Sequence, residues 1–314
     1  MPTALTRSQC LQFHAEPIDF DALAHAQMEK NIRELRAMVA SIGLDDDRAW
    51  DIYQKALESC PLDAAAKESF PQYRSGYMKQ YLLKEERELK ALAGMGATRE
   101  DLRAEIGASI FTARRFAVSP MRQTLHQHAV CRWLAENVPF LDSAVELPNH
   151  GKGALYVENG HIVPEAGRSP ESCEKSIDLQ MVYTFAEKEL KIYATHKYTD
   201  MEGGGQDNQY SDVITTLDEA RGSTDPDTVI AAILDGPYYQ RPSRSARDGG
   251  SRMEHLKKER QSRQDRILVT DHAHFCTACI PFIRDWLAAG FPEEQIQEET
   301  ARLDALEAGA QARA

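Results

Sequence analysis

The chain has 314 residues, of which 42% are hydrophobic and 27% charged, and this composition excludes a disordered or low-complexity protein. Its net charge of −12 argues against indiscriminate coating of nucleic acid, although the local charge around a bound duplex matters more than the total. No apolar run approaches the ~18 residues of a membrane span, and the N-terminus lacks the apolar core of a signal peptide. We therefore expect a cytoplasmic protein with a full core.

Residues 19–140 are predicted to be helical. Apolar side chains recur at helical spacing at Ile32, Leu35, Val39 and Ile42. Further helices are expected at Ala49–Ser59, Tyr73–Leu92, Arg99–Ala104 and Met121–Asn137. Thr98 is the predicted N-cap of the helix that begins at Arg99, because Asp101 stands three residues later. Nothing in this region carries obvious chemistry, and contact with DNA or with a second subunit stays open as its role.

The pattern changes near Pro139 to short runs rich in Ile, Val, Tyr and Thr. Strands are predicted at Ala154–Val157, Ser176–Phe185 and Leu190–Thr199, and the polar stretch before Leu190 indicates a hairpin between the last two. A loop of three glycines, 203–205, then leads into a predicted helix over Gln206–Ala220.

Two more strands are predicted at Val229–Leu234 and Arg266–Val269, with a charged helix, Met253–Ser262, between them. From about 291 the chain is rich in Glu and Ala and is expected to be a helical tail. This order indicates an α/β fold with a mixed sheet flanked by helices. The predicted organisation is a helical region over 1–140, a core over 141–290 and an acidic tail over 291–314.

Asp178 is a polar residue in an otherwise apolar strand, and Lys197 ends the partner strand nineteen positions later. Antiparallel strands joined by a tight hairpin bring such ends together. Phosphodiester hydrolysis uses this pairing, because a carboxylate can anchor Mg²⁺ while a lysine positions or deprotonates the attacking water. Without further context, an Asp and a Lys on neighbouring strands are usually a surface ion pair.

The surrounding segments supply that context. They are His196-Lys197-Tyr198-Thr199, Gly203-Gly204-Gly205-Gln206-Asp207-Asn208-Gln209-Tyr210-Ser211-Asp212-Val213, Ile233-Leu234-Asp235-Gly236-Pro237-Tyr238-Tyr239 and Ile267-Leu268-Val269-Thr270-Asp271. In order, they resemble type II restriction endonucleases of the PD-(D/E)XK nuclease superfamily, over roughly residues 140–285. The resemblance implies a PD-(D/E)XK-like core that cuts double-stranded DNA at specific sequences with Mg²⁺, leaves a 5′-phosphate and acts as a homodimer.

Carried over by residue, Asp178 matches the first metal-binding aspartate and Lys197 the catalytic lysine. The family pattern expects an acid two residues before the lysine, where this chain has Thr195. Some members place that acid on the following helix. Candidates here are Glu202, Asp207, Asp212 and, on an earlier helix, Glu136. Asp212 has the expected spacing and is the preferred second metal ligand.

Gln206 and Tyr210 share one helix face at positions i and i+4, and with Asp207 they resemble residues that support the site in relatives. Gln206 and Asp207 are equally consistent with capping of a helix after the glycine loop. His196 should point to the sheet face opposite Lys197 because side chains alternate along a strand, and it is expected to be structural.

Between Arg241 and Arg266, nine basic residues stand against four acids. A solvated charged surface explains such a run by itself. Beside a nuclease site, phosphate contact is the better interpretation. The predicted DNA-binding residues are Arg241, Arg244, Arg247 and Arg252.

The cluster His272, His274, Cys276 and Cys279 contains a Cys-x-x-Cys pair that zinc could bind. All four residues fall within eight positions, without a distant second pair of ligands. The two cysteines also fit one buried helix face, since free cysteine packs as a small apolar residue. Core packing is therefore the preferred interpretation, and a zinc module is an alternative.

Two other functions stay open. One is a structure-specific repair or recombination nuclease on the same core. The other is a DNA-binding protein without catalysis, which the loss of an acid at Thr195 favours.

Overall fold

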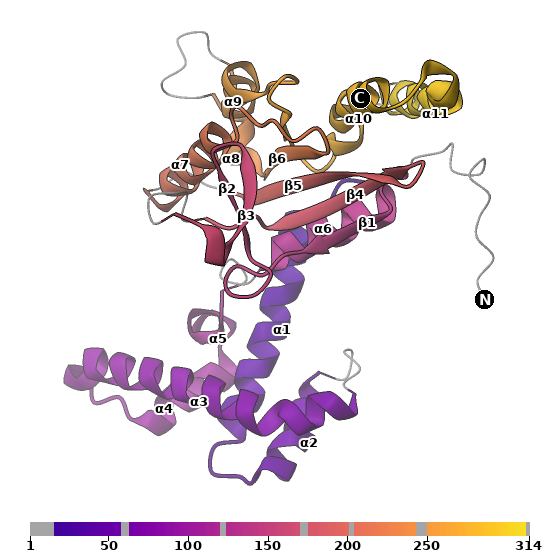
Figure 1. The fold of residues 1–314 in the computed structure, drawn as a ribbon. Coiled ribbons are helices and arrows are strands. Elements are labelled where there is room, and N and C mark those ends of the chain that lie inside the picture. Colours follow the sequence, from indigo (N-terminus) through magenta and orange to yellow (C-terminus); the bar gives the residue numbers. More distant parts are fainter. Residues whose placement is uncertain are drawn as a thin grey trace. The chain divides into compact units, whose positions relative to one another are not determined.

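The computed structural model describes residues 16–57, 63–119, 124–169, 175–200, 204–242 and 250–311, with side chains placed for all of these except 204–208 and 310–311. The chain forms two compact units (Figure 1). One is Asp19–Leu125, and the other comprises the chain from His126 onward together with Ile18 and the described residues before it. Within these ranges, no helix is both long and apolar enough to cross a membrane.

The first unit is helical, as the sequence predicts. Its helices are α1 (Phe20–Ala40), α2 (Asp46–Ala56), α3 (Ala64–Leu92), the 3₁₀ turn η2 (Ala93–Met95), α4 (Arg99–Ala108) and α5 (Ile110–Phe116). Thr98 caps α4 in a capping box with Asp101, which confirms that prediction. The short helix α5 is an addition to the predicted set.

A buried carboxylate organises this helical unit. Glu85 of α3 is fully buried and accepts hydrogen bonds from Arg103 Nε at 2.6 Å and from the Tyr81 hydroxyl at 2.8 Å. Arg99 Nε lies 3.1 Å from the same carboxylate. A buried charge is tolerated only when it is paired in this way, so these contacts fix how α3 and α4 pack.

The second unit contains the mixed sheet that the sequence predicts, within an α/β fold. Five strands lie in the order β1 (Ser143–Glu146), β4 (Leu179–Phe185), β5 (Lys188–Tyr198), β6 (Thr228–Asp235) and β7 (Ile267–Thr270). β1, β4 and β5 pair antiparallel, whereas β5, β6 and β7 pair parallel. A separate two-stranded sheet joins β2 (Leu155–Glu158) to β3 (His161–Pro164). The four-residue strands β1 and β3 were not predicted.

The predicted hairpin is the link between β4 and β5. Ala186 and Glu187 make its two-residue turn, and both have a positive φ, of 47° and 66°. Turns of this hand match the right-handed twist of the strands and keep them closely paired. The ladder runs from Phe185 opposite Lys188 to Leu179 opposite Ala194.

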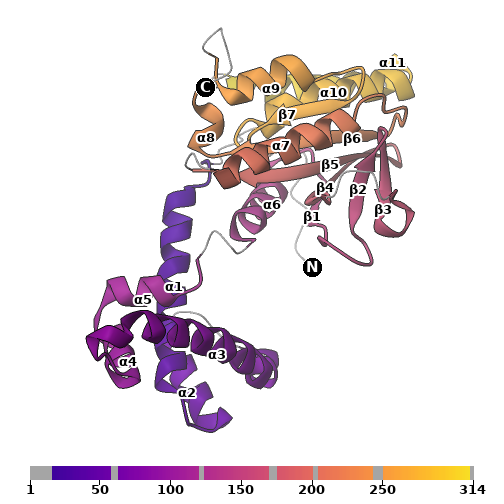
Figure 2. The same ribbon diagram turned by 90° about the vertical axis from the view of Figure 1, so that its left-hand side faces the viewer.

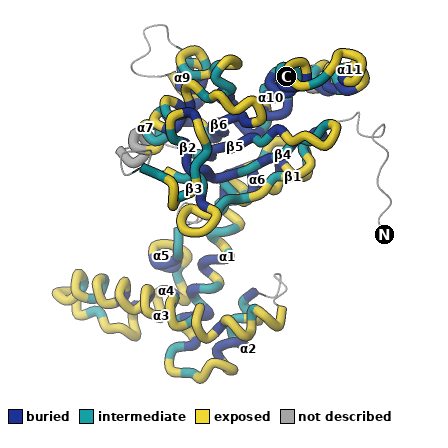
Figure 3. The backbone as a smooth tube through the Cα atoms, in the orientation of Figure 1, coloured by how far each residue is buried: buried dark blue, intermediate teal, exposed yellow. Residues whose placement is uncertain are grey.

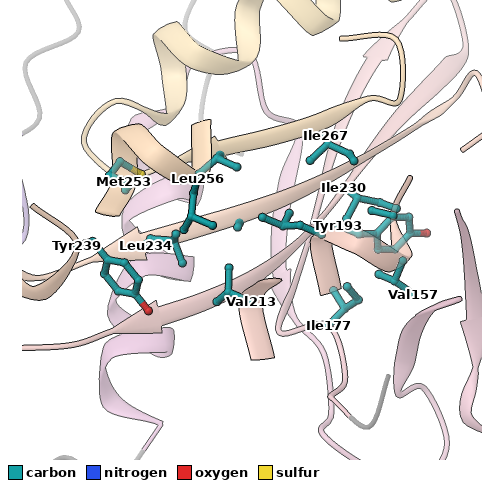
Figure 4. Packing of buried hydrophobic residues seen from close by; sticks show 14 of the residues in the cluster. Val157, Ile177, Tyr193, Val213, Ile230, Leu234, Tyr239, Met253, Leu256 and Ile267 are labelled. Atoms are coloured by element: carbon teal, nitrogen blue, oxygen red, sulfur yellow. The ribbon is translucent and has the colours of Figure 1, made fainter. Parts of the chain in front are cut away.

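One face of the sheet is covered by α7 (Gly204–Glu219), α8 (Pro237–Gln240) and α9 (Arg252–Arg260). Figure 4 shows the apolar side chains that fill this layer. Tyr193, Ile230 and Leu234 of the sheet pack there with Val213 of α7 and Leu256 of α9. Figure 2 shows α7 lying along β5 and β6.

The opposite face is covered by α6 (Leu125–Asn137) and α10 (Phe275–Gly290). Tyr183 of β4 meets Trp286 of α10 edge-on, with ring centroids 5.8 Å apart, and Trp133 of α6 meets the ring of His272 at 5.0 Å. Because both faces are covered, every residue of β6 is buried (Figure 3). Such strands are typical of parallel sheets.

The unit boundaries differ from the predicted ones. Contacts separate the units at Leu125, not at 140, because α6 packs on the sheet. The predicted tail is α11 (Glu293–Gln311), and it is part of the core unit. It packs on α10, and Glu299 accepts a hydrogen bond of 2.9 Å from the Tyr183 hydroxyl.

Gly236, the residue after β6, makes a very close backbone approach at the carboxyl end of the sheet. Its φ is +101°, and a Cβ built on it would lie 2.3 Å from the carbonyl oxygen of Thr199, just after β5. Only glycine fits this position, so the segments that follow β5 and β6 pack closely against each other.

We predict that Gly236→Ala lowers the free energy of unfolding by about 3 kcal/mol or more, because backbone overlap adds to the strain of a positive φ. Gly222→Ala is the matched control, since Gly222 has a φ of +75° but open space around it. It should cost only about 1–2 kcal/mol. Urea denaturation measures both, and equal losses would contradict the packing role of Gly236.

Candidate functional site

Asp178 and Lys197 meet at the carboxyl end of β5. Asp178 directly precedes β4, and Lys197 is the penultimate residue of β5. Lys197 Nζ donates to Asp178 Oδ2 at 3.1 Å. The carboxylate side chain is 9% exposed and the lysine side chain 21%. The hairpin therefore brings these two side chains together, as the sequence predicts, with the lysine still accessible from solvent.

Two further groups donate to the same oxygen of Asp178. They are the Thr195 hydroxyl at 3.1 Å and the main-chain N–H of His196 at 2.8 Å. Thr195 stands where the nuclease pattern expects an acid, and here it orients Asp178. All three donors that the structure records bind Oδ2, and none from the described residues binds Oδ1.

The main chain of Asp178 is also held on both sides. Its N–H donates to the Ala194 carbonyl at 3.0 Å, and its carbonyl accepts from Leu147 N–H at 2.9 Å and from Gln127 Nε2 at 3.2 Å. The antiparallel pairing of β4 and β5 and the helix α6 therefore fix the direction of the carboxylate. Gln127 gave no signal in the sequence, because it lies 51 residues from Asp178.

His196 points to the opposite face of the sheet, as strand alternation predicts. Its Nε2 lies 3.1 Å from Asp235 Oδ2, and Nδ1 of His272 lies 2.8 Å from Asp235 Oδ1. Burial acts to raise the pKa of Asp235, but the hydrogen bonds from the two imidazoles outweigh burial and hold that pKa well below its usual value. Asp235 is therefore an ionised carboxylate inside the fold.

A third histidine lies on this face. The ring of His126, on α6, is 4.2 Å from the ring of Tyr198, the last residue of β5. Burial, with the nearby His196 as a second cause, lowers the pKa of His126 to about 4. This imidazole is therefore neutral at physiological pH.

The acids proposed as the second metal ligand lie in different parts of the fold. Asp212 lies on α7, where its carboxylate is 3.5 Å from the ammonium of Lys175. Glu136 is exposed on α6, the helix that covers the sheet face carrying His196. Glu202 and the side chain of Asp207 lie outside the described residues.

The fit of the site to Mg²⁺ is partial within the described side chains. No group of three or more His, Cys, Asp or Glu side chains among them is arranged to hold a metal ion. Mg²⁺ often binds through one or two carboxylates and keeps several waters. Asp178, with Oδ1 facing no described donor, could supply one carboxylate to such a site.

Tyr210 and Gln209 attach α7 to the core and to the end of β5. Tyr210 packs on the buried core, with its ring 6.3 Å from that of Tyr238. The side chain of Gln206 lies outside the described residues. Gln209, which the sequence analysis did not single out, accepts a hydrogen bond of 3.0 Å from the Thr199 hydroxyl and so ties α7 to the end of β5.

The predicted DNA-binding arginines do not behave alike. Arg241 is exposed, while Arg244 and Arg247 lie outside the described residues. Arg252 is only 7% exposed, and its guanidinium lies over the Tyr238 ring at 4.1 Å and donates to the Tyr238 carbonyl at 3.2 Å. The prediction of a DNA contact is therefore corrected for Arg252, because a guanidinium in this position cannot reach a phosphate.

Two more basic residues of the run are engaged by acids, which reduces the positive charge available to a phosphate. Arg260 pairs with Asp218 at 3.2 Å, and Arg263 pairs with Asp285.

The Cys-x-x-Cys pair packs inside the fold. Cys276 and Cys279 are buried on α10, which confirms the preferred interpretation. Burial raises the pKa of the Cys276 thiol to about 12 and raises that of Cys279 as well. Metal binding needs thiolates, so this environment disfavours a zinc site. His274 instead places Nδ1 2.7 Å from Asp271 Oδ1.

Comparison of the chain with protein-family models, with curated proteins and with solved structures gives no match.

We predict that His126 makes the protein less stable in acid. Its pKa is about 4 in the folded chain and about 6.5 when unfolded, so below pH 6.5 only the unfolded chain takes up the proton. The contribution of neutral His126 to the free energy of unfolding is therefore fully present above pH 6.5 and is lost as the pH falls towards 4. The loss attributable to His126 between pH 7 and pH 5 is about 2 kcal/mol.

Urea unfolding of the wild type and of His126→Asn at both pH values measures this difference. His161→Asn, at an exposed histidine, is the control and should keep the wild-type pH dependence. An unchanged dependence in His126→Asn would rule out the buried neutral imidazole as its cause.

Proposed function

We propose that the chain is a Mg²⁺-dependent endonuclease that hydrolyses double-stranded DNA on a PD-(D/E)XK-type core. The observation that carries this proposal is the Asp178–Lys197 pair, nearly buried at the end of a hairpin whose second strand continues into a parallel sheet. The order of the motifs around it, which resembles type II restriction endonucleases, supports the same reaction.

The burial of the pair distinguishes it from an ordinary surface ion pair. Removing two charges from water is costly, and apolar side chains of similar volume would stabilise the fold equally well or better. Three donors on one carboxylate oxygen hold Asp178 in a single orientation. A charged pair that is fixed and still reachable through the partly exposed Lys197 fits a reaction site better than a stabilising contact.

Each residue then has a definite task. Asp178 would hold the metal ion, together with a carboxylate from Asp212 or from the segment before it. When bound, the ion would polarise the phosphoryl oxygen and acidify a water. Lys197 has three N–H donors, of which one binds Asp178, so the others can orient the attacking water or the scissile phosphate.

The substrate follows from the resemblance and from local charge. Exposed Arg241, with Arg244 and Arg247, would contact the phosphate backbone, which positions a duplex without reading its sequence. Sequence-specific cleavage, in the cytoplasm, by a homodimer with one site for each strand is the form of the activity that the restriction-enzyme resemblance favours.

A DNA-binding protein without catalysis is the second candidate. It is favoured by Thr195, which supplies a hydroxyl and no negative charge at the position where the family pattern has an acid. Binding of DNA with no cleavage in any divalent metal would distinguish it.

We predict that the wild type cuts plasmid DNA in Mg²⁺ and that Asp178→Asn and Lys197→Met each lower the rate by about 100-fold or more, because each removes a group that acts on the metal or the water. Discrete fragments of phage DNA would indicate sequence-specific cleavage, whereas a smear or junction-specific nicks would indicate a repair nuclease.

Lys191→Met is the matched control, because Lys191 lies on the same strand and the same face but pairs with Glu189 near the hairpin turn. It should cut at the wild-type rate. Full activity of Asp178→Asn would end the proposal.

A further inference from the structure

Asp235 is a buried carboxylate that the proposed reaction does not use. Asp235, the last residue of β6, is only 3% exposed. Its Oδ1 accepts from the main-chain N–H of His272 at 3.2 Å and lies 2.8 Å from Nδ1 of the same residue, and its Oδ2 lies 3.1 Å from Nε2 of His196. Both oxygens are thus engaged, so the carboxylate has one orientation.

The hydrogen positions in this cluster follow from its partners. His272 Nε2 accepts the main-chain N–H of Ile18 at 2.9 Å, so the proton of a neutral His272 is on Nδ1 and points at Asp235. Asp235 is an acceptor only, because the two imidazoles keep its pKa low. His196 must therefore carry a proton on Nε2. Both imidazoles therefore donate to Asp235, and Asp235 accepts on both of its oxygens.

The cluster reaches the candidate site through the main chain of His196. The β4–β5 ladder ends with Leu179 opposite Ala194, so beyond Ala194 no β4 strand residue supports β5. The N–H of His196 binds the carboxylate of Asp178 there. On this stretch β5 pairs with β6 on one side and contacts Asp178 on the other. The His196 side chain, on the opposite face of the sheet, contacts Asp235.

We propose that Asp235 is a positioning residue for the Asp178–Lys197 site. Asp235 holds the His196 imidazole on one face of the sheet and thereby fixes the main chain at His196. The N–H of His196 donates to Asp178, and the neighbouring residues Thr195 and Lys197 supply the other two donors to that carboxylate. This role deepens the proposed function and rests on it. Neighbours that orient the groups of a metal site typically change activity by about 10–100-fold when they are removed.

The test compares Asp235→Asn with two substitutions of His196. The two imidazoles contact different oxygens of Asp235, and asparagine would present an NH₂ donor in place of one of them, so it cannot accept from both imidazoles in this arrangement. His196→Leu removes the tie to Asp235, whereas His196→Gln can still donate an N–H to Asp235. We expect Asp235→Asn and His196→Leu to lower kcat for plasmid cleavage by about 10–100-fold with KM near the wild-type value, and His196→Gln to recover most of the rate.

A second measurement does not depend on activity. In protein labelled with ¹⁵N-histidine, NMR should show wild-type His196 with its proton on Nε2 and His272 with its proton on Nδ1. Asp235→Asn should shift the main-chain amide signal of His196. Asp271→Asn is the matched control, because Asp271 binds His274 in the same way one strand further on, and it should leave the signal in place.

An unmoved His196 amide together with a wild-type rate in Asp235→Asn would overturn the proposal, as would a loss of stability with no change in kcat. If Asp235→Asn fails to fold, the contrast between His196→Leu and His196→Gln decides the question by the same readings. If the wild type cuts no DNA, the nuclease function fails, while the amide signal still decides whether Asp235 holds the His196 peptide.

Discussion

The ion pair between Asp178 and Lys197 is the interaction on which the account depends. It forms where an antiparallel hairpin joins a parallel sheet, so that the start of β4 meets the carboxyl end of β5. Two charges in a nearly buried position are unfavourable unless each finds partners. Asp178 finds three donors on β5, and the helix α6 and the residue after β1 hold its main chain. The surrounding fold thus supports one carboxylate and one amine in a fixed relation.

β5 divides its side chains between two environments. Thr195 and Lys197 face the layer that α7 covers and contact Asp178, while His196 and Tyr198 face α6 and meet a buried cluster of histidines around Asp235. The alternation of side chains along β5 therefore places Thr195 and Lys197, which contact Asp178, on one face and His196, which contacts Asp235, on the other. Close packing of Gly236 against the chain after β5 holds the ends of the two strands together.

Local patterns in the sequence predicted much of this arrangement. Alternation and turn residues predicted the β4–β5 hairpin, and the hairpin alone brings Asp178 to Lys197, because the two residues are close along the chain. Contacts between distant segments were not predictable. Asp235 lies 39 residues from His196 and 37 from His272, and a single sequence has no signal that joins them. Arg252 was predicted to be an exposed, DNA-binding residue. Its stacking on Tyr238 depends on how α8 and α9 pack, which the sequence alone does not show.

The location of a bound metal ion tests the central claim most directly. In a crystal grown with a short DNA duplex and Mn²⁺, anomalous scattering would place the ion. We predict an ion about 2.1 Å from a carboxylate oxygen of Asp178, with Lys197 turned towards a phosphate or a water. A metal-saturated complex with no ion at Asp178, and with the Asp178–Lys197 pair unchanged, would contradict it.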